Sequence, residues 1–223
     1  AVPDAVCTEL LCHGITPQSG YGMTEACSHH YTLPDDPPAR ITGTSGTACD
    51  GYEIRIWSQE DQNKEAEIGE IGQIGGRGAS LMLGYFEDEE STTASFNSHD
   101  YFMTGDLGSL DADGYLLITG RKKDVIIRGG HNIYPARIEA LAMRHGAVER
   151  AAAVPVPDER LGERVCIAVT LRPDAALIPV DLLAHLDAEG LSKYDMPEFF
   201  IELDHMPLTS NGKILKRELN DWI

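Results

Sequence analysis

The chain has 223 residues, of which 42% are hydrophobic and 24% charged, and its formal net charge is -18. This length and hydrophobic content suffice for a buried core and predict two compact units rather than a disordered chain. The 18 basic residues face 36 acidic ones, which argues against the clustered basic surface that nucleic-acid binding requires.

The first half of the chain is expected to be a mostly antiparallel β unit. Residues 1–30 predict a helix, a short strand and a loop. Residues 51–57 alternate apolar with polar side chains, which is typical of a half-buried strand, and residues 68–76 and 114–119 follow the same pattern. Between them, residues 87–94 form an acidic segment whose early carboxylates suit the N-terminus of a short helix.

After Asp124 the pattern changes to alternating helices and strands. Pro135 begins a helix that runs to Arg144, because proline is favoured in the first helical turn. The other expected elements are strands at 151–156, 165–171 and 199–203, a helix at 180–189 and a last helix beginning near Leu215. The predicted fold class is therefore mixed α+β, with one domain over residues 1–123 and a small α+β domain over residues 124–223.

The cysteines and the apolar runs bear on the cellular location of the protein. Five cysteines form no C-x-x-C spacing, so neither a disulfide framework nor a zinc site is expected, and a reducing cytoplasm is the simplest location. Cys166 stands among apolar residues and is expected in the core. No apolar run approaches the length of about 18 residues that a membrane-spanning helix needs. Homo-oligomer formation stays open.

Four short motifs carry the functional signal. They occur in the order Tyr21-Gly-Met-Thr-Glu25, Thr104-Gly-Asp106, Gly120-Arg-Lys-Lys-Asp124 and Pro207-Leu-Thr-Ser-Asn-Gly-Lys213. Each alone is weak, and Thr-Gly-Asp alone is typical of a plain β-turn. In this fixed order, however, they resemble the acyl-CoA synthetase branch of the adenylate-forming (AMP-binding) superfamily, over essentially the whole chain. The resemblance implies ATP-dependent ligation of a carboxylic acid to coenzyme A through an acyl adenylate.

The resemblance assigns the first motif to the nucleotide. Tyr21 would lie beside the adenine, Gly22 would belong to the same nucleotide site, and Thr24 would donate its hydroxyl to the α-phosphate. Glu25 would be a ligand of Mg2+, which takes one or two carboxylates beside nucleotide oxygens. Taken alone, the motif could equally be a tight glycine turn.

The next motifs are assigned to the ribose. In the family, the carboxylate at the position of Asp106 accepts both ribose hydroxyls, and Arg121 also belongs to the nucleotide site. A carboxylate facing a vicinal diol would select ribonucleotides, because an unpaired buried carboxylate is costly.

The C-terminal residues are assigned to two successive steps. Asp124 resembles the hinge on which the small domain of the family turns between adenylation and thioester formation. Lys213 would act in the first step, as a compact positive charge at the carboxylate and phosphate. In the second step the loop at residues 128–132 would replace it, with Gly130 admitting the pantetheine arm and Asn132 contacting the phosphate.

Two departures from the family stand out. Relatives often show Pro-x-Glu-Ile-Glu where this chain has Arg137 in Pro135-Ala-Arg-Ile-Glu139. The phosphate loop that precedes the tyrosine motif in relatives is not found, since the segment at residues 43–47 follows Tyr21 and is expected to be a turn. The chain is therefore expected to be the C-terminal part of a longer enzyme and to be inactive alone.

His29 and His30 suggest a metal site, but neighbours on an extended chain point to opposite faces, so they are expected to be poor joint ligands and to line the acyl pocket instead. The expected partners are a small carboxylic acid, ATP and coenzyme A. Two alternatives stay open: an enzyme that loads the phosphopantetheine of a carrier protein, and a nucleotide-binding module without turnover. The acid itself is not specified.

Overall fold

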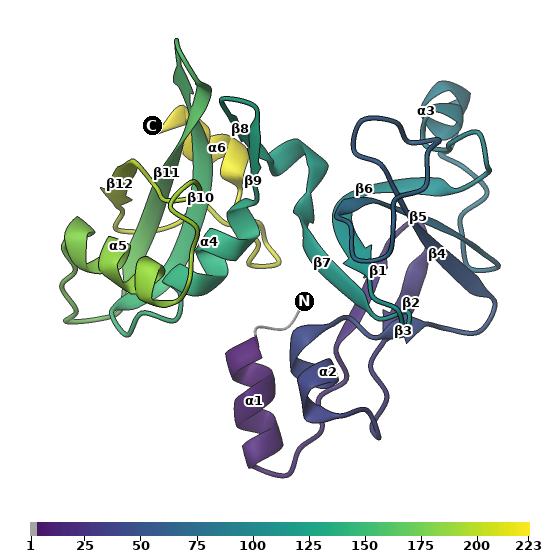
Figure 1. The fold of residues 1–223 in the computed structure, drawn as a ribbon, viewed down its shortest axis with the longest axis horizontal. Coiled ribbons are helices and arrows are strands. Elements are labelled where there is room, and N and C mark those ends of the chain that lie inside the picture. The colour runs from purple at the N-terminus through teal and green to yellow at the C-terminus, as the bar shows by residue number, and fades with distance from the viewer. Residues whose placement is uncertain (1–3) are drawn as a thin grey trace. The chain divides into compact units, whose positions relative to one another are not determined.

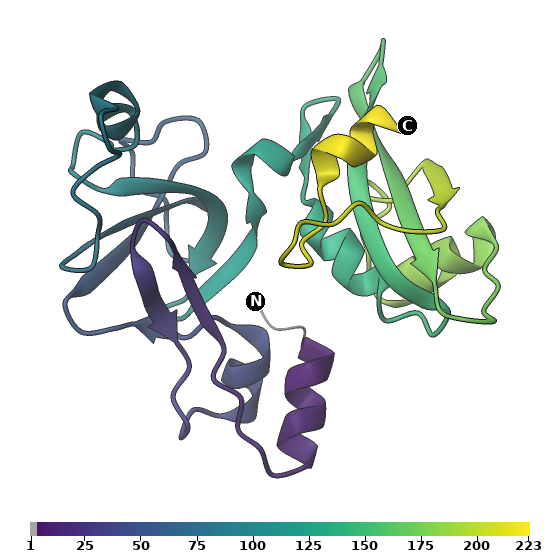
Figure 2. The ribbon, with the colours of Figure 1, turned by 180° about the vertical axis from the view of Figure 1, so that it is seen from behind.

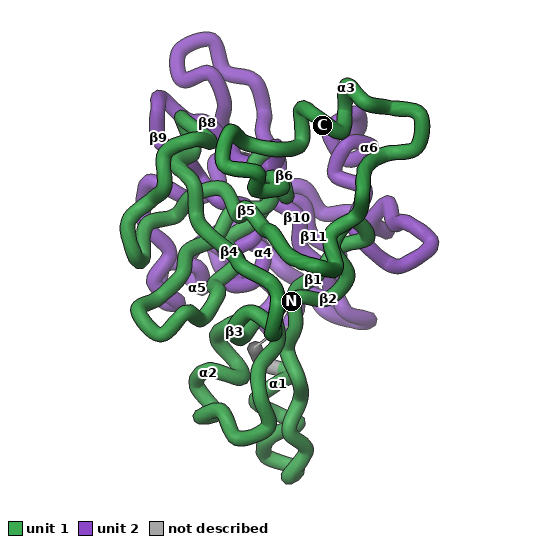
Figure 3. The backbone as a smooth tube through the Cα atoms, turned by 90° about the vertical axis from the view of Figure 1, so that its right-hand side faces the viewer, with its two compact units in different colours: residues 1–122 green, residues 123–223 purple. Residues whose placement is uncertain are grey.

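The computed structural model describes residues 4–223. They divide into two compact units, unit 1 up to Lys122 and unit 2 from Lys123 to Ile223 (Figure 3). Each unit has its own buried hydrophobic cluster. The division lies beside the expected boundary at Lys123 and Asp124. The assignment of the two units to the large and small domains of an enzyme stays a prediction.

Unit 1 is built on an antiparallel sheet of four strands in the order β4-β5-β6-β7 (Figure 1). The strands are Tyr52–Trp57, Gly72–Gly78, Phe102–Leu110 and Leu116–Arg121. The alternation expected in β4 is confirmed, because Tyr52, Ile54 and Ile56 are buried. Strand β6 was not expected from the sequence, and it carries the Thr104-Gly-Asp106 motif.

A second, three-stranded sheet of unit 1 carries the first motif. It contains β1 (Gly20–Met23), β2 (Cys27–Tyr31) and β3 (Thr47–Ala48), paired antiparallel in that order. Beside it, α1 (Asp4–Cys12) and α2 (Pro38–Gly43) lie against each other, as Figure 2 shows from behind.

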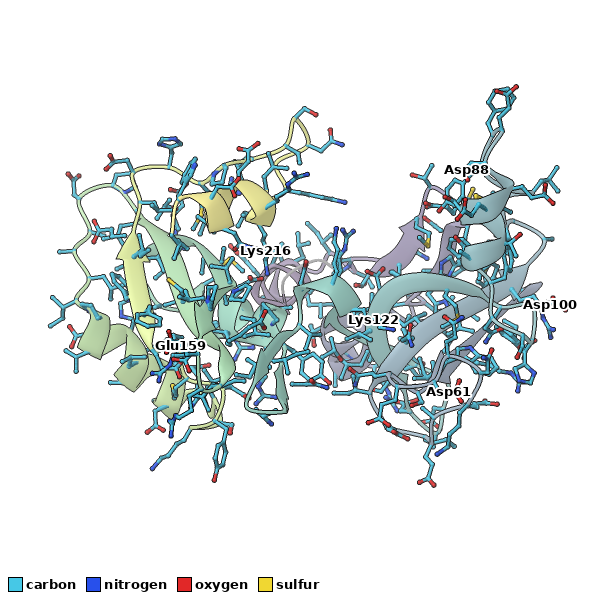
Figure 4. All side chains as sticks on the ribbon, turned by 90° about the horizontal axis from the view of Figure 1, so that it is seen from above. Asp61, Asp88, Asp100, Lys122, Glu159 and Lys216 are labelled. Carbon is cyan, nitrogen blue, oxygen red and sulfur yellow. The ribbon has the colours of Figure 1, made fainter. Side chains whose placement is uncertain are left out.

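The short helix α3 (Glu89–Ala94) has the acidic start expected of it. The Asp88 side chain accepts a hydrogen bond from the backbone N–H of Ser91, and Asp88 is labelled at the beginning of the helix in Figure 4. Acidic residues at this end also interact favourably with the helix dipole.

The glycines of β5 admit two aromatic rings from β4. A Cβ atom on Gly75 would lie 2.4 Å from Nε1 of Trp57, and one on Gly76 would lie 2.4 Å from the Tyr52 hydroxyl oxygen. Real Cβ atoms do not approach so closely, so the rings can lie on the sheet only where side chains are missing. These glycines therefore serve packing.

Unit 2 contains a five-stranded sheet. Its long hairpin, β10 (Val148–Asp158) and β11 (Gly162–Leu171), is joined by the parallel strand β12 (Phe199–Glu202). A second hairpin, β8 (Ile126–Arg128) and β9 (His131–Ile133), pairs through β8 with β11. The sequence had predicted a loop at this second hairpin.

Helices cover both faces of the unit 2 sheet. On one face, α4 (Pro135–Ala142) and α5 (Pro179–Ala188) pack through Ile138 and Leu182. On the other face, α6 (Lys216–Asp221) packs through Leu219 against a cluster that contains Cys166, confirming the core position of this cysteine. The two faces follow from the alternation of side chains along β10 and β11. The mixed α+β class expected from the sequence is confirmed.

Candidate active site

The first and second motifs meet inside unit 1. The Tyr21 hydroxyl donates a hydrogen bond of 2.7 Å to Oδ2 of Asp106, across 85 residues of sequence. Tyr21 is buried within β1, and the Asp106 side chain is 17% exposed. Burial raises the pKa of the Tyr21 phenol, and the negative charge of Asp106 raises that pKa further. The Tyr21 phenol therefore keeps its proton and donates a hydrogen bond to the Asp106 carboxylate, which is still partly exposed and can accept a ligand.

Arg121 approaches the other oxygen of the same carboxylate. It pairs with Asp106 in the register of β6 and β7, and its Nε lies 3.4 Å from Oδ1. The Arg121 side chain is 53% exposed, so the ion pair is solvated and contributes little to stability by itself. The pairing nevertheless places three of the predicted nucleotide residues in one cluster.

The Thr104-Gly-Asp106 motif is held in the strand rather than in an isolated turn. The Thr104 hydroxyl donates to the carbonyl of Ile74 on β5 at 2.9 Å and accepts from the Asp106 backbone N–H at 3.1 Å. Gly105 has a φ of +75°, which favours glycine. These contacts fix the backbone from which the Asp106 carboxylate projects.

Glu25 has partners that the sequence did not predict. The Tyr85 hydroxyl donates to Oε1 of Glu25 at 3.2 Å, and the Met82 N–H donates to its carbonyl at 2.7 Å. The pairing spans 60 residues, so no local sequence pattern could have indicated it. Thr24 beside Glu25 is exposed.

Gly22 lies where the hairpin of β1 and β2 leaves no room for a side chain. A Cβ atom there would lie 2.3 Å from the carbonyl oxygen of Cys27. The glycine therefore has a structural reason in addition to the nucleotide role predicted for it.

The role of Glu25 as a magnesium ligand stays a prediction. Among residues 4–223, no group of three or more His, Cys, Asp or Glu side chains is placed to hold a metal ion. Mg2+ completes its shell with phosphate oxygens and water and needs only one or two protein carboxylates. Glu25, half-buried and beside Thr24, could supply one such oxygen.

The expectation that His29 and His30 point apart is wrong. Tyr21 pairs with His30 while Gly22 pairs with Ser28, so β2 contains one extra residue, a β-bulge. A bulge breaks the alternation of side chains, and the two Nδ1 atoms lie 3.2 Å apart with both side chains fully buried. Burial lowers the pKa of each imidazole to about 4.

In unit 2, Gly130 and Asn132 are exposed at the hairpin of β8 and β9. Gly130 has a φ of +85° and open space around it. Beside it, the His131 ring lies 2.8 Å from the Asp195 carboxylate, an ion pair when the imidazole is protonated. The hairpin thus presents a glycine and an amide to solvent.

Lys213 and Asp124 also lie at surface turns. The Lys213 carbonyl accepts from the Thr209 N–H at 2.8 Å, and its N–H donates to the Thr209 hydroxyl at 3.0 Å, which closes a tight turn. The Lys213 side chain is exposed. Asp124 ends a single 3-10 turn, Lys122–Asp124, at the division between the units. The roles assigned to both residues stay predictions.

Comparison with known proteins supports the assignment of this chain to a family. The family model described as "AMP-binding enzyme" matches residues 1–86, and that described as "AMP-binding enzyme C-terminal domain" matches residues 137–213. A medium-chain fatty-acid–CoA ligase of Escherichia coli (strain K12) is 36% identical over 216 residues, covering 96% of this chain and 38% of that protein. A 2,3-dihydroxybenzoate-AMP ligase of Bacillus subtilis (strain 168) is 36% identical, over 94% of this chain and 38% of its own length.

Solved structures agree. The o-succinylbenzoate CoA synthetase of Bacillus subtilis, in complex with its acyl-adenylate intermediate, has a TM-score of 0.89 and 32% identity over 98% of this chain and 44% of its own. ATP-bound MatB from Rhodopseudomonas palustris has a TM-score of 0.86 and 33% identity, over 94% of this chain and 41% of its own. The chain belongs to the AMP-binding, adenylate-forming enzyme family. It spans well under half the length of these relatives.

Proposed function

We propose that this chain supplies the ribose-binding carboxylate and the lysine-bearing small domain of an ATP-dependent carboxylate:CoA ligase. The observation that carries the proposal is the cluster of Tyr21, Asp106 and Arg121, which joins three of the family motifs by direct contacts in unit 1. The names of the relatives, which include two CoA ligases or synthetases, support the reaction class.

The reaction would proceed in two steps. A carboxylate oxygen attacks the α-phosphorus of ATP, the bond from that phosphorus to the bridging oxygen breaks, and pyrophosphate leaves. The thiol sulfur of coenzyme A then attacks the acyl carbon, AMP leaves with the electron pair of the acyl–oxygen bond, and the thiol proton passes to solvent. Negative charge builds up at the phosphate in the first step, so positive charge there is the main catalytic requirement.

The residues divide between these steps. Thr24 would hydrogen-bond the α-phosphate, and Glu25 would hold Mg2+, which neutralises phosphate charge when bound. Lys213 would bring its ammonium to the reacting oxygens in the first step. Gly130 and Asn132 would serve the second step, after backbone rotation at Asp124. Free movement of a domain between two placements is a known way to order such half-reactions.

The experiment uses the intact enzyme, meaning the full-length protein that contains these residues. Incubation with ATP, Mg2+ and a panel of aliphatic, alicyclic and aromatic acids should give acid-dependent exchange of pyrophosphate into ATP. Addition of coenzyme A should then yield AMP and the thioester. The proposal is wrong if no acid supports exchange although the protein is folded and binds ATP.

A second acceptor is favoured by one observation. One relative at 36% identity is named an AMP ligase rather than a CoA ligase, and a carrier protein offers the same phosphopantetheine thiol as coenzyme A. Parallel assays with coenzyme A and with a phosphopantetheinylated carrier protein would separate the two acceptors by their kcat/KM. A module without turnover, the third candidate, is tested by the same exchange assay.

A cytoplasmic location accords with this substrate set and stays part of the proposal. Among the described residues, no helix is long and apolar enough to cross a membrane.

A further inference from the structure

The Asp106 carboxylate has a particular division of contacts between its two oxygens. An ionised carboxylate offers about four lone-pair sites, two on each oxygen. Tyr21 occupies one site on Oδ2 at 2.7 Å, and Arg121 faces one on Oδ1 at 3.4 Å. One site on each oxygen is left over, which matches the two donors of a vicinal diol.

Of the two contacts, only that of Tyr21 is rigid. The Arg121 side chain is half exposed and its contact is long, whereas the Tyr21 ring is buried. His29 lies edge-on to this ring with centroids 5.0 Å apart, and itself stacks on Tyr52 at 4.4 Å. Tyr52 in turn fills the space above Gly76. The phenol hydroxyl is therefore held at one point by a stack of buried rings.

We propose that the Tyr21 hydroxyl is a positioning group, which fixes the Asp106 carboxylate in the orientation that accepts both hydroxyls of a ribonucleoside and so sets the discrimination against deoxynucleotides. This inference rests on the proposed role of Asp106. It adds to the adenine contact predicted for Tyr21 a second function, carried by a different atom of the same side chain.

Tyr21 can affect selectivity because the carboxylate of an aspartate is otherwise free to rotate. Without a fixed donor, the carboxylate can rotate about its terminal bond, and a rotated group presents only one oxygen to the diol. Fixing it beforehand removes this reorganisation from the binding step. The resulting gain in binding free energy is full for a ligand with two hydroxyls and smaller for a ligand with one. The hydroxyl of Tyr21 therefore affects selectivity and not only affinity.

The test is Tyr21→Phe in the intact enzyme, with kcat/KM for adenylation measured for ATP, 2′-deoxy-ATP and 3′-deoxy-ATP. Loss of one hydrogen bond to a charged group predicts a fall of about tenfold for ATP. The fall should be clearly smaller for both deoxynucleotides, so that the ratio of ATP to 2′-deoxy-ATP decreases. The phenylalanine keeps the ring, so a contact with adenine is retained.

Tyr115→Phe is a matched control. Its hydroxyl donates to Oδ1 of Asp36 at 2.6 Å in the same unit, and neither residue belongs to the proposed site. This variant loses the same kind of hydrogen bond and should leave the nucleotide ratio unchanged. If Tyr21→Phe lowers kcat/KM for all three nucleotides in equal proportion, the hydroxyl is merely structural and the inference is wrong.

Asp106→Ala distinguishes failure of the role proposed for Tyr21 from failure of the role proposed for Asp106. If Tyr21 acts through Asp106, then Tyr21→Phe should change the nucleotide ratio no further in the Asp106→Ala background. A full effect of Tyr21→Phe in that background would overturn the inference alone. If Asp106→Ala itself leaves the ratio of ATP to 2′-deoxy-ATP unchanged, the proposed role of Asp106 is wrong and the inference with it.

Discussion

The two units place their predicted site residues in opposite ways. In unit 1, Tyr21 and Arg121 come from two different strands and both contact Asp106 on a third. In unit 2, Asn132 on strand β9 and Lys213 near a turn are both exposed. Under the proposed roles, the contacts for the ribose are formed within one folded unit, whereas Asn132 and Lys213 are exposed to solvent. Lys216 on α6, labelled in Figure 4, differs from these exposed residues because its ammonium is 2.6 Å from the Glu139 carboxylate.

We expect the greatest loss of activity from substitution of Lys213, an exposed residue of unit 2. Lys213→Ala in the intact enzyme should lower adenylation by two to three decades, the cost of about 3 to 4 kcal/mol for one donor at a charged transition state. Conversion of a supplied acyl adenylate and coenzyme A into thioester should stay near normal. Both half-reactions are measured separately, by pyrophosphate exchange and by thioester formation.

Arg217→Ala is the control for Lys213, because Arg217 is an exposed cation on the neighbouring helix α6. It should leave both steps unchanged. Equal damage to both steps by Lys213→Ala would contradict the assignment of the lysine to adenylation alone.

Gly130→Val should affect the other half-reaction. The side chain would project into the open space at the hairpin, and displacement of the thiol by about 1 Å can cost roughly a hundredfold in rate. Thioester formation from supplied acyl adenylate should therefore fall by about this factor while pyrophosphate exchange survives.

Backbone strain must be separated from obstruction in this variant, because valine is unfavourable at the φ of +85° found at Gly130. Gly190 has a φ of +81° and equally open space in the same unit. Gly190→Val carries the same strain outside the proposed site. If it slows the thiol step as much as Gly130→Val does, the role assigned to Gly130 is wrong.

The two buried histidines of unit 1 predict that its stability depends on pH. The imidazoles of His29 and His30 have a folded-state pKa of about 4, against an ordinary value of 6.5. Their contribution is complete above pH 6.5 and is lost as the pH falls toward 4, because the unfolded chain then binds more protons. Between pH 7.5 and 5, unit 1 should lose about 2 kcal/mol for each imidazole that stays neutral.

The positions of the two tryptophans allow the pH dependence of stability to be measured for unit 1 alone. Trp57 is buried in unit 1 and Trp222 is exposed in unit 2. In Trp222→Phe, fluorescence during urea unfolding reports on unit 1 alone. Adding His29→Phe should reduce the dependence on pH while an aromatic ring remains against Tyr52. An unchanged slope would show that His29 is not the titrating group.

The smallest expected effect is that of Asp106→Ala on ATP itself. Loss of a charged acceptor should weaken ATP binding and slow adenylation by at least about tenfold, or roughly 1.4 kcal/mol. The measurement is the KM for ATP and the rate of pyrophosphate exchange at saturating acid. Unchanged kinetics would contradict the ribose-binding role proposed for Asp106.

Local patterns in the sequence determined much of the fold. The alternation over residues 51–57 predicted β4, and Pro135 marked the start of α4, because burial on one face repeats along the chain with the period of the element. The ordered motifs also indicated the family that the comparisons found. What these patterns share is that each is complete within a few neighbouring residues.

Only the tertiary structure decided which distant groups meet. Strand β6, interrupted by glycine and aspartate, has no clear alternation of its own and is fixed by its neighbours β5 and β7. The bulge that turns His29 toward His30 depends on the register with β1, and the contact of Tyr85 with Glu25 closes a loop of 60 residues. Register and loop closure are set by pairing across the whole unit. The sequence therefore named Tyr21 and Asp106 as site residues, but only folding showed that one holds the other.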